Sequence, residues 1–107
     1  MTLRTWLDTR QPRPPERLAR RIEEVLGDVF DSPLDTAADR SLACITAAEG
    51  LLRDLLSRGT AGRESALDLL TVDALATYAF EAAGESPDAI PDRAAAAMRQ
   101  FAAVAGP

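Results

Sequence analysis

Three carboxylates are spaced so that helices could bring them together as a metal site. Asp73 and Glu81, with Thr77 between them, form a row at i, i+4 and i+8 in an otherwise apolar stretch. Glu49 lies at the border of the apolar side of the preceding stretch. If these stretches face each other, the three acidic side chains supply hard oxygen ligands suited to Mg²⁺. The competing interpretation is structural: Glu49 pairs with Arg53 one turn later, and the row from residue 73 to 81 is a solvated strip.

A metal site of this kind would make the chain a Mg²⁺-dependent hydrolase of a phosphate-containing small molecule. All-α nucleotide pyrophosphohydrolases of the MazG type use carboxylates carried on helices in this way, but no resemblance of this chain to any family extends beyond composition. The two paired-acid motifs of that type are absent, and Glu23, Glu24 and Asp28 form the nearest equivalent. A hydrolase is therefore the alternative function, with Glu49, Asp73 and Glu81 as candidate metal ligands. The favoured interpretation assigns no catalytic residue and no cofactor.

The residue types that the chain lacks exclude much chemistry. There is no histidine and no lysine, and arginine supplies all 12 cations. Histidine-based triads and zinc sites are thereby excluded, as are lysine Schiff bases and phosphate-binding P-loops. The one cysteine, Cys44, has apolar neighbours and is expected to pack rather than react. A skew toward arginine and alanine is typical of GC-rich bacterial genomes.

Two further absences concern the location of the protein. No apolar run approaches 18 residues, so no membrane span is expected. The first residues lack the apolar stretch of a secretory signal, and a single cysteine provides no disulfide framework. We therefore expect a cytoplasmic protein.

Charge is distributed unevenly along the chain. Residues 1–22 carry a net charge of +4 and residues 23–107 a net charge of −9. A basic arm could bind nucleic acid or an acidic protein, but a body of this charge would repel phosphate. We therefore expect no binding to nucleic acid. The favoured interpretation is that the arginines pair with the acidic surface of their own chain, and an acidic protein partner is the second possibility.

Hydrophobic periodicity predicts five helices and no strand. A short helix over 2–8 is followed by a proline-rich linker at 11–15, and a second helix runs from Pro15 to Gly27 or to Val29. The third begins at Thr36, or alternatively at Ser32, and ends before Gly59. The fourth covers 63–83 and is capped by Gly84, and the fifth covers 91–105. Short connections indicate a single all-α domain, an up-and-down bundle of four principal helices (15–107) preceded by the short helix and linker (1–14).

The apolar faces of these helices differ in width. The fourth is apolar in nearly every direction, which predicts a buried, central helix. The third has an apolar side that covers half its circumference and includes Leu42 and Leu56. The fifth has a single stripe, made of Ala94, Ala97, Met98, Phe101 and Val104. Four helices leave part of this apolar surface uncovered, so we expect a homodimer.

The short first helix carries the residues expected to mediate contacts. Leu3, Trp6 and Leu7 share one face of a segment too short to be helical in isolation. Such a segment must dock on its own bundle or reach across the linker to a second copy, and we expect Trp6 to be buried in the dimer. The sequence thus favours a small, non-catalytic, self-associating module for protein interaction.

Overall fold

The computed structural model describes residues 1–59, 62–85 and 90–105, with side chains described except at 90–96 and 105. The helices are α1 (Leu3–Asp8), α2 (Glu16–Leu26), the 3-10 helix η1 (Gly27–Asp31), α3 (Ala37–Arg58), α4 (Arg63–Gly84) and α5 (Ile90–Ala105). Over these ranges the only β-type pairing is an isolated bridge between Thr2 and Pro33. The predicted all-α bundle is confirmed.

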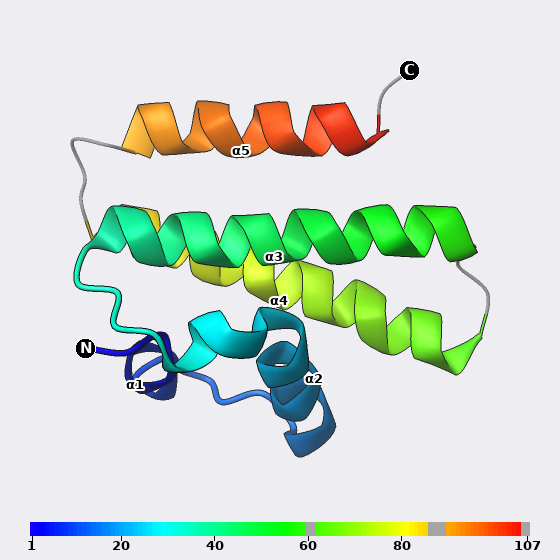
Figure 1. The fold of residues 1–107 in the computed structure, drawn as a ribbon, viewed down its shortest axis with the longest axis horizontal. Helices are drawn as coiled ribbons and strands as arrows, with labels where there is room; N and C mark the ends of the chain where they lie inside the picture. The colour runs from blue at the N-terminus through cyan, green and yellow to red at the C-terminus, as the bar shows by residue number, and fades with distance from the viewer. Residues whose placement is uncertain (60–61, 86–89, 106–107) are drawn as a thin grey trace.

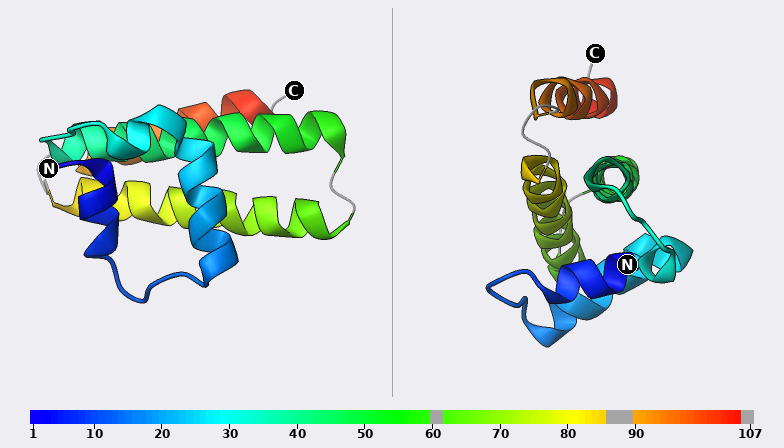
Figure 2. Two further views of the ribbon diagram at one scale, coloured as in Figure 1. Left: turned by 60° about the horizontal axis from the view of Figure 1, so that its bottom comes forward. Right: turned by 90° about the vertical axis from the view of Figure 1, so that its left-hand side faces the viewer.

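Two long antiparallel helices, α3 and α4, form the centre of the molecule (Figure 1). The chain then turns back, so that α5 runs antiparallel to α4 and lies against both α3 and α4 (Figure 1). In contrast, α1 and α2 cross the α3–α4 pair instead of running along it (Figure 2). The predicted central helix, α4, contacts α2, α3 and α5, and α3 shares this central position because it contacts α2, α4 and α5.

Helix boundaries follow the capping residues. The Thr36 hydroxyl accepts a hydrogen bond from the Asp39 amide at 3.0 Å, so α3 begins after Thr36 and not near Ser32. Gly59 ends α3 with a φ of 92°, a value that residues with a Cβ rarely adopt. Gly27, with a φ of 58°, ends α2, and the chain continues as η1. The predicted cap at Gly84 is wrong by one residue, since Gly84 still belongs to α4.

The core is built from every helix of the chain. Leu3, Cys44, Thr71, Leu55 and Leu75 are the largest fully buried side chains. Ala79, Ala82 and Ala83 of α4 are buried, and the Ser41 hydroxyl of α3 donates a hydrogen bond to the Ala79 carbonyl at 2.8 Å. The two long helices are therefore joined by apolar packing and by a buried polar contact.

Some residues predicted to be buried are exposed. On α4, Leu69, Leu70 and Phe80 are 45 to 57% exposed, because α2, α3 and α5 cover only part of the circumference of this helix. Met98 of the predicted α5 stripe is 68% exposed, whereas Ala97 is buried; the Ala94 side chain lies outside the described residues. No helix in the described ranges is long and apolar enough to cross a membrane.

Candidate functional site

The predicted metal ligands lie apart from one another. Glu49 accepts a hydrogen bond from Arg53 Nη2 at 2.7 Å, as the structural interpretation expects. Asp73 and Glu81 are exposed on α4, and Glu81 Oε2 lies 3.8 Å from Arg10 Nη1. Among the described side chains, no group of three or more acidic or cysteine residues is arranged to hold a metal ion. The cluster on which the hydrolase alternative depends is therefore not assembled.

Leu3 and Trp6 belong to the core of their own chain. Both are at most 3% exposed, and Leu7 is half-buried against the same core. Trp6 Nε1 donates a hydrogen bond to Glu85 Oε1 at 2.7 Å, and its ring packs edge-on against Tyr78. The first helix thus docks on its own bundle in the structure, which is the first of the two alternatives for this segment. In this arrangement Trp6 is not available to a second copy.

Glu85 connects the first helix to the end of α4. Its second oxygen accepts a hydrogen bond from Arg40 Nη2 at 2.9 Å, and Arg40 Nη1 donates to the Leu34 carbonyl. Burial raises the pKa of Glu85, but the bonds from Trp6 and Arg40 favour the carboxylate and leave the pKa below its ordinary value. One carboxylate thus fixes α1, α3 and α4 together.

The N-terminal arginines pair within the chain, as expected. Arg4 binds Asp31 and Glu23, and four further arginines are paired: Arg10 with Glu81, Arg13 with Asp8, Arg20 with Glu16, and Arg21 with both Glu24 and Asp68. In the part of the chain that is described, Arg17 alone of these six arginines forms no ion pair. The positive charge of residues 1–22 is thus largely neutralised by the protein itself, and binding to an acidic partner stays a prediction.

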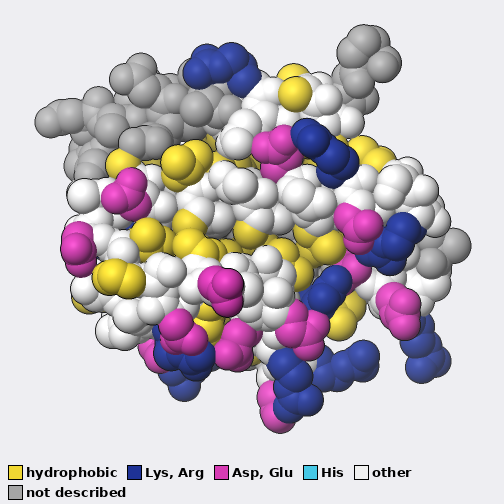
Figure 3. All heavy atoms as spheres, in the orientation of Figure 1, with side chains coloured by type: hydrophobic (Ala, Val, Ile, Leu, Met, Phe, Trp, Pro, Cys, Tyr) yellow, Lys and Arg dark blue, Asp and Glu magenta, His cyan; other side chains and the backbone are white. Residues whose placement is uncertain are grey.

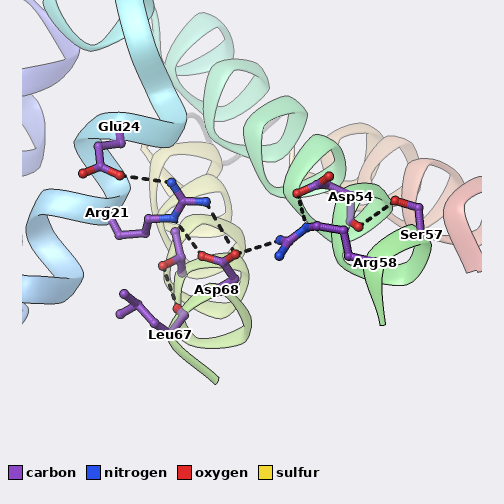
Figure 4. A network of polar contacts seen from close by, with 8 residues as sticks. Arg21, Glu24, Asp54, Ser57, Arg58, Leu67 and Asp68 are labelled. Atoms are coloured by element: carbon purple, nitrogen blue, oxygen red, sulfur yellow. Dashed lines mark hydrogen bonds and ion pairs between the residues drawn. The ribbon is translucent and has the colours of Figure 1, made fainter. Parts of the chain in front are cut away.

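A buried carboxylate that the sequence analysis missed lies at the far end of the bundle (Figure 4). Asp68 of α4 is 4% exposed and accepts hydrogen bonds from Arg21 Nε at 2.7 Å and from Arg58 Nη2 at 3.0 Å. These bonds, with the one from Arg21 the stronger, hold its pKa below the ordinary value. Asp68 therefore ties α2, α3 and α4 together. The sequence signal for a buried Asp68 was its position on the apolar stripe of α4, four residues before Val72.

Cys44 is an inert core residue, as expected. It is fully buried on α3, and this burial raises the pKa of its thiol to about 12. The thiolate needed for nucleophilic attack or metal binding is therefore scarce at neutral pH.

An apolar groove lies on the face shown in Figure 3, between α3 and the α2–η1 segment. Its volume is about 450 Å³. Two of its lining residues, Asp39 and Thr46, are polar. The others are aliphatic: Val25, Leu26, Val29, Leu34, Leu42, Ala43 and Ala47. Leu42 is half exposed at its border, although the sequence placed it on the buried side of α3. Such a groove can bind an apolar side chain or a helix face, but it contains no catalytic constellation.

Comparison of the chain with protein-family models, with curated proteins and with solved structures gave no match.

Proposed function

We propose that this protein is a small, non-catalytic, cytoplasmic module that self-associates through the groove between α3 and α2–η1. The observation that carries the proposal is Leu42, an exposed aliphatic side chain that borders the groove directly. Exposed apolar surface beside an apolar hollow is typical of surfaces that bind protein.

A second copy of the chain is the occupant that suits this surface. In a two-fold dimer the same patch meets itself, so it must contain both the protruding group and the hollow that receives it. Leu42 and the groove satisfy this requirement on one face. Leu56, 53% exposed, lies on the same side of α3 about four turns later, roughly 21 Å along the helix. The proposed contact face therefore runs along α3 from Leu42 to Leu56.

The chemistry of the rest of the molecule supports a non-catalytic role. Glu49 and Glu81 are in ion pairs with Arg53 and Arg10, and the one cysteine is buried. A chain with a single, unpaired cysteine suits a reducing compartment, which supports the cytoplasmic location in this proposal.

The proposal is tested by a pair of aspartate substitutions on different faces. Leu42→Asp places a charge beside the groove, whereas Leu70→Asp places one on the outer side of α4, where leucine is 57% exposed. Both leucines are exposed, so both variants are expected to fold. We expect Leu42→Asp to dissociate the dimer, as measured by sedimentation velocity, and Leu70→Asp to leave it unchanged. Equal behaviour of the two variants would contradict the assignment of this face.

Salt provides an independent test of the occupant. Each copy carries a net charge of −5, and Asp39 lines the groove, so two copies repel each other. Added salt screens this repulsion and should strengthen the dimer. Dissociation of the dimer by salt would contradict an apolar interface. A protein that is monomeric at every salt concentration would contradict self-association, and the groove would then bind a different, basic partner.

A further inference from the structure

A second hollow in the molecule lies between the two helices that cross the central pair. It is a cavity of about 220 Å³ bordered by α1, the linker, α2, η1 and α4. The left view of Figure 2 shows α1 and α2 side by side across α4, joined by the looped linker. This cavity is separate from the groove, with which it shares no lining residue.

The walls of the cavity are apolar, and two of them are aromatic. Phe30 of η1 and Tyr78 of α4 contribute rings, and aliphatic surface comes from Leu7, Pro14, Ala19 and Ile22. Ile22 and Phe30 are less than a tenth exposed, and Tyr78 is fixed by its edge-on contact with Trp6, so these walls are preformed. A preformed apolar hollow binds apolar molecules without a cost for ordering the protein.

The polar groups of the cavity indicate what kind of molecule it takes. Asp8 and Arg13, which are exposed and pair with each other at 3.4 Å, lie at its mouth. The Tyr78 hydroxyl forms no hydrogen bond within the described part of the chain, although the side chain is half-buried. Among the described side chains Arg40 Nε is the fully buried polar atom without a partner, so the Tyr78 hydroxyl has accessible surface and can bond to a bound molecule. The cavity thus combines apolar walls with one available hydrogen-bonding group and no unpaired charge.

We infer that this cavity is a binding site for an uncharged, single-ring aromatic molecule with a hydroxyl group, of which phenol is the simplest example. An apolar protein cavity of about 150 Å³ accommodates benzene, and drug-sized ligands need at least about 300 Å³. The volume here lies between these sizes. The ring would pack between Phe30 and Ile22, and the ligand hydroxyl would bond to that of Tyr78.

The test uses 4-fluorophenol as the probe and fluorine NMR as the readout. We expect saturable binding to the intact chain in the millimolar range or tighter. Ala19 is exposed at the edge of the cavity, so Ala19→Leu should narrow the opening and weaken binding at least tenfold. Ala66→Leu is the matched control, because Ala66 is exposed on α4 and borders none of these hollows; it should leave binding unchanged.

The hydrogen bond is tested separately with Tyr78→Phe, which keeps the ring. This variant should bind 4-fluorophenol about fivefold more weakly and fluorobenzene equally well. The indole N–H resonance of Trp6, the only tryptophan, reports on the same site because its ring contacts Tyr78. Absence of saturable binding and of any shift of this resonance would overturn the inference, as would equal binding to the Ala19→Leu and Ala66→Leu variants.

Discussion

The indole nitrogen of Trp6 donates a hydrogen bond to Glu85 across 79 residues of sequence, over a distance of 2.7 Å. This bond joins the first helix to the last turn of α4, and Arg40 shares the same carboxylate from α3. Two cation–π contacts, from Arg10 and Arg40, also reach the Trp6 ring. The first helix, too short to persist in isolation, is therefore part of the fold because it is bound at this point.

Replacing Glu85 should destabilise the protein. Glu85→Ala removes the acceptor from both Trp6 and Arg40, so we expect the free energy of unfolding to fall by about 1–3 kcal/mol. Urea unfolding followed by Trp6 fluorescence measures this directly. Glu81→Ala is the control, since its pair with Arg10 is 3.8 Å long and partly exposed, and it should cost less than about 1 kcal/mol. Similar losses in the two variants would show that the Trp6–Glu85 bond does not anchor α1.

Asp68, the buried carboxylate at the other end of the bundle, should contribute as much to the free energy of unfolding as Glu85. Asp68→Asn keeps the shape of the side chain but removes the charge that Arg21 and Arg58 bind. Because both arginines still reach solvent, the expected loss is about 1–3 kcal/mol rather than that of a fully buried pair. Thermal unfolding would measure it, with the exposed Asp73→Asn as a control expected to change stability by less than about 0.5 kcal/mol.

Acid unfolding should reveal the lowered pKa of Asp68. The folded state holds this pKa below its ordinary value of 3.8, so the unfolded chain takes up the proton first as the pH falls. The stability that Asp68 contributes is therefore complete above pH 3.8 and is lost progressively below it. Stability measured against pH should fall more steeply for the wild type than for Asp68→Asn in this range. Parallel curves would contradict a lowered pKa.

Cys44 should be unreactive while the protein is folded. Burial raises the pKa of its thiol to about 12, so both access and ionisation are unfavourable at pH 8. We expect an aromatic disulfide reagent to label Cys44 only after denaturant unfolds the chain. Rapid labelling of the native protein would show that α3 and α4 separate readily around this residue.

The local elements were predictable from the sequence, because caps and periodicity act over a few residues. Thr36 and Gly59 define the ends of α3 in the sequence as in the structure. Tertiary features were harder to predict. The path of α2 across the bundle, and hence the groove bordered by Leu42, depends on how η1 redirects the chain after Gly27. Helical-wheel analysis shows which side of α3 is apolar, but not how much of that side its neighbours cover.

In the candidate sites, too, local contacts were predictable from the sequence and tertiary contacts were not. The pairing of Glu49 with Arg53 is a local i, i+4 contact and was predicted correctly. The two partners of Asp68, Arg21 and Arg58, come from two other helices, and Trp6 meets Glu85 across 79 residues of sequence. Spacing along one helix carries no information about such contacts, because they depend on the packing of the whole bundle.

The mass of the protein in solution tests the central claim of self-association most directly. Light scattering across a chromatographic peak, at concentrations up to the millimolar range, distinguishes the two states of the 11.4 kDa chain. We predict a mass of about 23 kDa, twice that of the chain. The fraction of the protein that is dimeric should increase with added salt. A mass that stays near 11.4 kDa at the highest concentration and at high salt would contradict the proposed dimer.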